Sequence, residues 1–204
     1  NEVLQRQFEI ANRFLGGEWG RLFGYIPFPQ GMDRTAEMYE KIVKNGPYSE
    51  VGPKAQMNIG AAREKQKDFP EAVRAYERAA DRYANREEVA SEALFKAGLA
   101  YQKEAKTADY DQTVASRAIA TFEDFSTLHP NDNRVPEAQK RIESLKVEQA
   151  RGAFEIAKFY EKRKKWKAAV IYYNVANNVD RSSPYAEISR MRIEELNKRI
   201  GTNQ

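Results

Sequence analysis

The side chains best suited to acid–base chemistry occur singly or as adjacent pairs. His129 is the only histidine, and Pro130 follows it directly. The acidic pairs Glu87–Glu88 and Glu194–Glu195 are neighbours in sequence. Neighbouring residues of a helix point about 100° apart, so neither pair is suited to act jointly as general acid and general base. We therefore expect His129 to stabilise a helix end, where a basic residue suits the helix dipole, and the acidic pairs to lie on solvated faces.

Motifs that hold a cofactor or a metal are missing from the sequence. It has no cysteine, no histidine pair at metal-ligand spacing, no phosphate-binding glycine loop and no Gly-x-Ser-x-Gly turn. We therefore predict that the protein is not an enzyme and has no catalytic residue, cofactor or metal. The net charge of +4, from 34 basic and 30 acidic residues, is too small a bias to indicate nucleic-acid binding.

One dense basic run stands out, Lys162-Arg-Lys-Lys-Trp-Lys167. Such a run is suited to contact acidic protein segments or anionic lipid. It is equally typical of a solvated turn between two helices. Both interpretations remain open from the sequence.

The basic run separates two segments with helical periodicity. Ala153, Ile156, Ala157 and Tyr160 precede it, and Ala169, Val170, Tyr173 and Ala176 follow it. The first set has the spacing i, i+3, i+4, i+7 and the second i, i+1, i+4, i+7, and both spacings place side chains on one face of an α-helix. The small residues allow two helices to approach closely, and the tyrosines fill the gaps beside them. The pattern predicts a helical hairpin.

The same hairpin pattern recurs along the chain. A small residue, an aromatic residue four positions later and a small or apolar residue three positions after that occur at 72, 76 and 79, at 118, 122 and 125, and at 169, 173 and 176. Gly60, Gly98 and Ala157 take equivalent places in the first helix of each pair, and Thr35, Tyr39, Ile42 and Pro47 form a degraded copy. This register resembles the tetratricopeptide repeat (TPR). We predict an all-α, TPR-type helical-hairpin solenoid, coiled as a right-handed superhelix.

We expect one TPR-like domain over residues 1–204. Its parts are an N-terminal cap (1–32), a degraded repeat (33–52), a repeat (53–85), a repeat with an insertion (86–135), a further repeat (136–183) and a C-terminal capping helix (184–204). Asp33 and Asn85 are predicted N-caps, and Asp68 with Glu71 is a predicted capping box. The aromatic, glycine-rich stretch Trp19–Phe28 is interpreted as an irregular cap or as a patch that docks on a partner.

Partner binding is expected on the face of each first helix that points away from the second helix, because TPR solenoids bind partners on their concave side. Among these residues, we expect Phe154 to be an apolar anchor and Lys158 a charged contact. Burial between successive repeats is the alternative, above all for Met57 and Leu99. The candidate residues are Met57, Phe95, Leu99, Gln102, Arg151, Phe154, Lys158 and Glu161.

Three stretches of the last third resemble one family of TPR proteins. They are Gly152-Ala-Phe-Glu-Ile-Ala-Lys-Phe-Tyr160, Trp166-Lys-Ala-Ala169 with Tyr173, and Ser182-Ser-Pro-Tyr-Ala186. They look like the BamD-like lipoproteins of outer-membrane β-barrel assembly, and the resemblance covers about Thr35 to Leu196. The sequence departs from the family at Ala84, where a turn proline is common, and in lacking the lipidated cysteine, which we expect upstream of Asn1.

The resemblance implies a scaffold at the periplasmic face of the outer membrane. Its partners would be other outer-membrane assembly components, and only a lipid anchor upstream of Asn1 would attach it to the membrane. A second class of function stays open, a soluble TPR adaptor or a Tol-Pal-type envelope coordinator that captures a peptide segment of its partner. A signal peptide ending in a lipidated cysteine would favour the first class.

Overall fold

The computed structural model describes residues 2–18, 31–107 and 112–201 of the chain, and within them it contains helices but no strand. The predicted aromatic cap, Trp19–Phe28, lies outside the described residues. The helices are α1 (Glu2–Gly16), α3 (Gly31–Asn45), α4 (Gly52–Lys65), α5 (Phe69–Arg82), α6 (Glu87–Thr107), α7 (Gln112–Leu128), α8 (Val135–Lys162), α9 (Trp166–Val179) and α10 (Pro184–Gly201).

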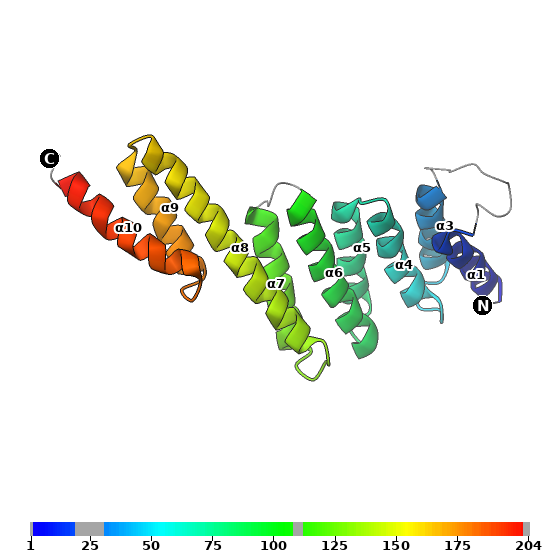
Figure 1. The fold of residues 1–204 in the computed structure, drawn as a ribbon. Coiled ribbons are helices and arrows are strands. Elements are labelled where there is room, and N and C mark those ends of the chain that lie inside the picture. The colour runs from blue at the N-terminus through cyan, green and yellow to red at the C-terminus, as the bar shows by residue number, and fades with distance from the viewer. Residues whose placement is uncertain (1, 19–30, 108–111, 202–204) are drawn as a thin grey trace.

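The helices stand side by side in one elongated row from α1 to α10 (Figure 1). Each described helix packs mainly on the helices before and after it in the chain. Smaller contacts join α1 to α4, α4 to α6 and α8 to α10, which are the first helices of successive hairpins. This arrangement confirms the predicted all-α, TPR-type solenoid.

The predicted packing stripe forms the core of each hairpin. Tyr76, Phe122 and Tyr173 are fully buried, as are the alanines at 72, 118 and 169. An added Cβ at Gly60 would lie 2.5 Å from Tyr76 Cε1, and one at Gly98 would lie 2.7 Å from Phe122 Cε1. The first and second helices of these two hairpins are therefore too close for any side chain larger than hydrogen at these positions.

The predicted helix starts agree with the structure at some positions and not at others. The Asp68 side chain accepts a hydrogen bond from the backbone N–H of Glu71, which confirms Asp68 as the N-cap of α5. The two other N-cap predictions are wrong. Asp33 lies inside the first turn of α3 and pairs with Arg63 of α4, and α6 begins at Glu87, two residues after Asn85. A short polar side chain near a helix start is the right residue type, but it does not determine which residue starts the helix.

Helix α8 is much longer than the helices it packs on, with 28 residues against 17 in α7 and 14 in α9. Its first half packs on α7, and its second half packs on α9 (Figure 1). Gln149 Nε2 donates to the Gln112 carbonyl at 3.1 Å and to Ser116 Oγ at 2.8 Å, so α7 begins beside this part of α8. The remaining turns of α8 extend beyond α7 and carry the α8–α9 turn with its basic run.

The predicted division into a cap, repeats and a capping helix stays a proposal. The helices nearest the predicted starts at 53, 86, 136 and 184 begin at Gly52, Glu87, Val135 and Pro184. Helix α1 packs on α3, where Tyr39 Oη donates to Asn12 Oδ1 at 2.6 Å and its ring meets Phe8. The first described hairpin therefore includes residues that the sequence assigned to the cap.

Candidate partner-binding site

The three predicted site residues at equivalent places, Met57, Phe95 and Phe154, are all buried. Each lies three positions before the close-packing site of its hairpin, Gly60, Gly98 or Ala157. The ring of Phe95 meets those of Phe122 and Phe125 at centroid distances of 5.7 and 5.2 Å, and the Arg134 guanidinium lies 5.2 Å from the Phe95 centroid. The prediction that these residues face away from the second helix is therefore wrong for Phe95, whose ring packs on α7 of its own hairpin. Burial, the alternative left open by the sequence, describes all three positions.

A second set of equivalent residues joins neighbouring repeats through polar contacts. Glu64 of α4 accepts from Lys103 of α6 at 2.9 Å. Gln102 of α6 accepts from Arg141 of α8 at 2.8 Å. Glu161 of α8 forms an ion pair with Arg192 of α10. Each first helix thus presents an acceptor to a cation of the next first helix, and the predicted residues Gln102 and Glu161 belong to this ladder.

Two further predicted residues, Leu99 and Arg151, are not among those that line the cavity between α8, α9 and α10. Leu99 is half-buried against the cluster that contains Phe122 and Phe125. Arg151 is exposed on α8, where its Nε donates to Glu148 Oε2 at 2.7 Å. The geometry gives neither residue a ligand-binding role, and partner contact at these positions stays a prediction.

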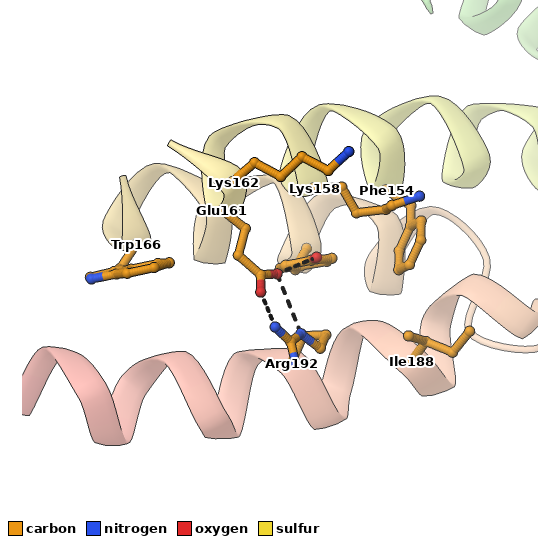
Figure 2. A pocket seen from close by; sticks show the side chains of 8 residues that line it. Phe154, Lys158, Glu161, Lys162, Trp166, Ile188 and Arg192 are labelled. Carbon is orange, nitrogen blue, oxygen red and sulfur yellow. Dashed lines mark hydrogen bonds and ion pairs between the residues drawn. The ribbon is translucent and has the colours of Figure 1, made fainter. Parts of the chain in front are cut away.

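Three of the predicted residues, Phe154, Lys158 and Glu161, line one cavity between α8, α9 and α10 (Figure 2). The cavity has a volume of about 370 Å³. Its walls combine aromatic and aliphatic surface with several charged groups. It is lined by Phe154, Lys158, Glu161, Lys162, Trp166, Tyr173, Ile188 and Arg192.

Aromatic rings form the apolar part of the cavity wall. Phe154 meets Tyr173 of α9 and Tyr185 of α10, each at a centroid distance of 5.5 Å. Phe154 is only 9% exposed, so most of its ring supports the packing of the three helices. Ile188 of α10 is 40% exposed and supplies an accessible aliphatic side chain. An apolar group of a ligand would be desolvated here against surfaces already held in place.

Glu161 organises the polar part of the cavity. Its carboxylate accepts from Tyr173 Oη at 2.7 Å and from the Arg192 guanidinium, as the dashed lines in Figure 2 show. Arg192 Nη1 also donates to Glu195 Oε2 at 2.6 Å. Burial raises the pKa of Tyr173, so its hydroxyl stays protonated and donates to Glu161. These bonds satisfy Glu161 internally and hold α10 against α8.

Positive charge is gathered at the rim of the cavity. Lys158 Nζ lies 3.0 Å from Glu155 Oε1 and 5.6 Å from the centroid of the Phe154 ring. Lys162 is exposed at the end of α8, and the Arg199 guanidinium lies 5.8 Å from the centroid of the Trp166 ring. With one carboxylate and three cations among its lining residues, the cavity is suited to a ligand with apolar and acidic groups.

The only histidine, His129, is not among the residues that line the cavity. His129 packs on Phe125, and its Nδ1 lies 3.0 Å from Glu87 Oε1 at the junction of α6 and α7. Within residues 2–18, 31–107 and 112–201, no three His, Cys, Asp or Glu side chains cluster as metal ligands would. None of the helices described there combines the length and apolarity needed to cross a membrane.

Sequence reasoning did not include Trp166, Ile188 and Arg192 in the site. They lie on α9 and α10, whereas the predicted residues lie on first helices up to α8. Periodicity groups residues within one helix, but it does not predict which residues of separate helices surround a common cavity. The one sequence feature that could have indicated part of this cavity is Trp166, an aromatic residue inside the basic run.

A comparison with protein families gives a match over most of the chain. The model of the family described as "YfiO: Outer membrane lipoprotein" matches residues 31–204. The match covers all the helices from α3 to α10 and confirms the BamD-like family predicted from the sequence. No curated protein matches the chain significantly.

Proposed function

The chain belongs to the YfiO family of outer membrane lipoproteins, and on that premise we propose that it is a non-enzymatic scaffold of outer-membrane β-barrel assembly. It acts at the periplasmic face of the outer membrane and holds other assembly components. The cavity between α8, α9 and α10 captures a segment of one of these partners. Phe154, Lys158 and Glu161 belong to this site together with Trp166, Ile188 and Arg192.

One observation carries this proposal: an open cavity beside α10, the last described helix, has polar groups that are already positioned. The Glu161–Arg192 and Glu161–Tyr173 contacts fix the walls without a ligand. Preorganised walls lower the entropy lost on binding, so a short segment gains affinity here.

The role of each side chain follows from its exposure. Ile188 is the apolar group that a bound segment would cover, whereas Phe154 supports the wall from behind. Lys158 and Lys162 attract acidic groups of the segment at the rim, where charges improve the rate and specificity of association more than its strength. We therefore expect binding to depend on Ile188 and stability to depend on Phe154.

The test compares two substitutions on the same helix. Ile188→Ser removes the apolar contact inside the cavity, whereas Met191→Ser changes an exposed apolar residue of α10 outside the cavity lining. The immobilised wild type should retain an outer-membrane assembly component from a native envelope extract. Ile188→Ser should weaken this capture at least tenfold, about 1.4 kcal/mol, and Met191→Ser should leave it unchanged.

Thermal melts of both variants serve as the control for folding. Substitutions at exposed sites usually change stability by less than about 0.5 kcal/mol, so both variants should melt close to the wild type. Equal capture by all three proteins would place partner binding outside the cavity. Capture of proteins unrelated to outer-membrane assembly would contradict the scaffold role itself.

A further inference from the structure

The turn between α8 and α9 carries a compact group of exposed cations. This group, the basic tip, consists of Lys162, Arg163, Lys164, Lys165 and Lys167. All five side chains are exposed. Because the whole chain has a net charge of only +4, the tip accounts for its positive character, and the remainder is slightly acidic.

The cations of the basic tip are not neutralised within the described part of the molecule. The ion pairs found there involve other residues, including several on α8 and α10 beside the tip. Glu161, the nearest carboxylate in sequence, is directed into the cavity and is bound by Arg192 and Tyr173. The local positive charge therefore faces solvent without an internal counterion.

The shape of the tip distinguishes between possible anionic partners. Its five residues follow the end of one helix, a tight turn with Lys164 at φ +57°, and the first turn of the next helix. Side chains on such a convex turn diverge, since successive helical residues point about 100° apart. An acidic peptide needs a groove that aligns its charges, and only Lys162 of the tip borders the cavity. A broad anionic surface can meet all five cations at once.

An exposed aromatic side chain lies beside the tip. Phe159 is 47% exposed, and the Arg163 guanidinium lies 4.0 Å from the centroid of its ring. Aromatic residues flanked by cations are suited to the boundary between headgroups and acyl chains of a bilayer. The family of outer membrane lipoproteins places a bilayer within reach of the protein.

We propose that the basic tip binds the headgroups of an anionic lipid surface and so gives the scaffold a membrane contact of its own. Each lysine or arginine near such a surface strengthens binding roughly fivefold. The cations act together, and the interaction weakens as salt screens them. Lys162 belongs to both the tip and the cavity rim, whereas Lys165 and Lys167 do not line the cavity and so report the lipid contact separately.

Vesicle co-sedimentation tests the proposal with two matched double variants. Lys165→Gln with Lys167→Gln removes two tip cations, and Lys41→Gln with Lys44→Gln removes two exposed cations of α3. The wild type should bind phosphatidylglycerol-containing vesicles at low salt and ignore pure phosphatidylcholine. The tip variant should bind about 20- to 30-fold more weakly, and the α3 variant should bind like the wild type. High salt should release the wild type.

Three outcomes would overturn the proposal. The first is that the wild type sediments no better with anionic than with neutral vesicles. The second is that both double variants lose binding equally. The third outcome is that the tip binds an oligoglutamate peptide while the wild type ignores the anionic vesicles, which would identify acidic protein as its partner. Circular dichroism of each variant shows that it is folded, so a loss of binding reports the surface.

Discussion

Replacing Gly60 with alanine tests the close approach of α4 and α5. The new Cβ would lie 2.5 Å from Tyr76 Cε1 and 2.6 Å from Cζ, well inside the distance of a normal carbon–carbon contact. Tyr76 is only 1% exposed, so its ring has no free space to enter. Overpacking of this kind costs about 1–3 kcal/mol, whereas alanine gains up to about 1 kcal/mol over glycine in helix propensity. We expect a net loss of about 1–2 kcal/mol.

Urea unfolding followed by far-ultraviolet circular dichroism measures this loss. Gly16→Ala is the matched control, because no heavy atom lies within 4 Å of its added Cβ, and it should leave stability unchanged or raise it slightly. The loss for Gly60→Ala should become smaller when Tyr76 is first replaced by leucine, since the ring that clashes is then gone. A Gly60→Ala variant as stable as Gly16→Ala would refute the close approach.

Three further predictions concern other parts of the chain. The Arg134 side chain, donating to the carboxylate, holds the pKa of Asp132 well below its usual range. Asp132→Asn should therefore lower stability near neutral pH, and urea titrations should show this difference disappearing as the pH falls below about 4. Phe154→Ala should cost about 3 kcal/mol or more by the same measurement, because the ring is buried between α9 and α10. Lys67→Gly should raise the free energy of unfolding in urea titrations by up to about 1 kcal/mol, since Lys67 has φ +62°.

The hairpins could be predicted from the sequence because their signal is local and repeated. The residues at 72, 76 and 79 lie on one face of one helix, and the same residue types return at 118, 122 and 125. Helix geometry converts this spacing into a buried stripe, and the structure buries all six residues. Glycine at 60 and 98 marks the places where the facing ring leaves no room for a side chain.

The concave face was harder to predict because its exposure depends on neighbouring repeats. The rings of Phe95 and Phe154 meet Phe122 and Tyr173 on the second helix of their own hairpin, so the prediction that both point away from that helix is wrong. The spacing of the two residues does not show how far each ring reaches toward the second helix. It does not show how closely the next first helix approaches. Arg134 and the next hairpin cover Phe95, and Tyr185 of α10 covers Phe154. Large rings at these positions gain more from desolvation between repeats than from exposure to water.

The polar ladder shows why the last repeat differs from the earlier ones. Glu64, Gln102 and Glu161 each bind a cation of the following first helix, so the same contact joins α4 to α6, α6 to α8 and α8 to α10. The last of these contacts is made with α10, the last described helix of the row (Figure 1). Ile188 and Arg192 of α10 border the cavity. In an interior repeat, the second helix of the next hairpin would pack beside the corresponding residues. Packing therefore leaves space beside the last described helix, and the ladder keeps that space in a fixed shape.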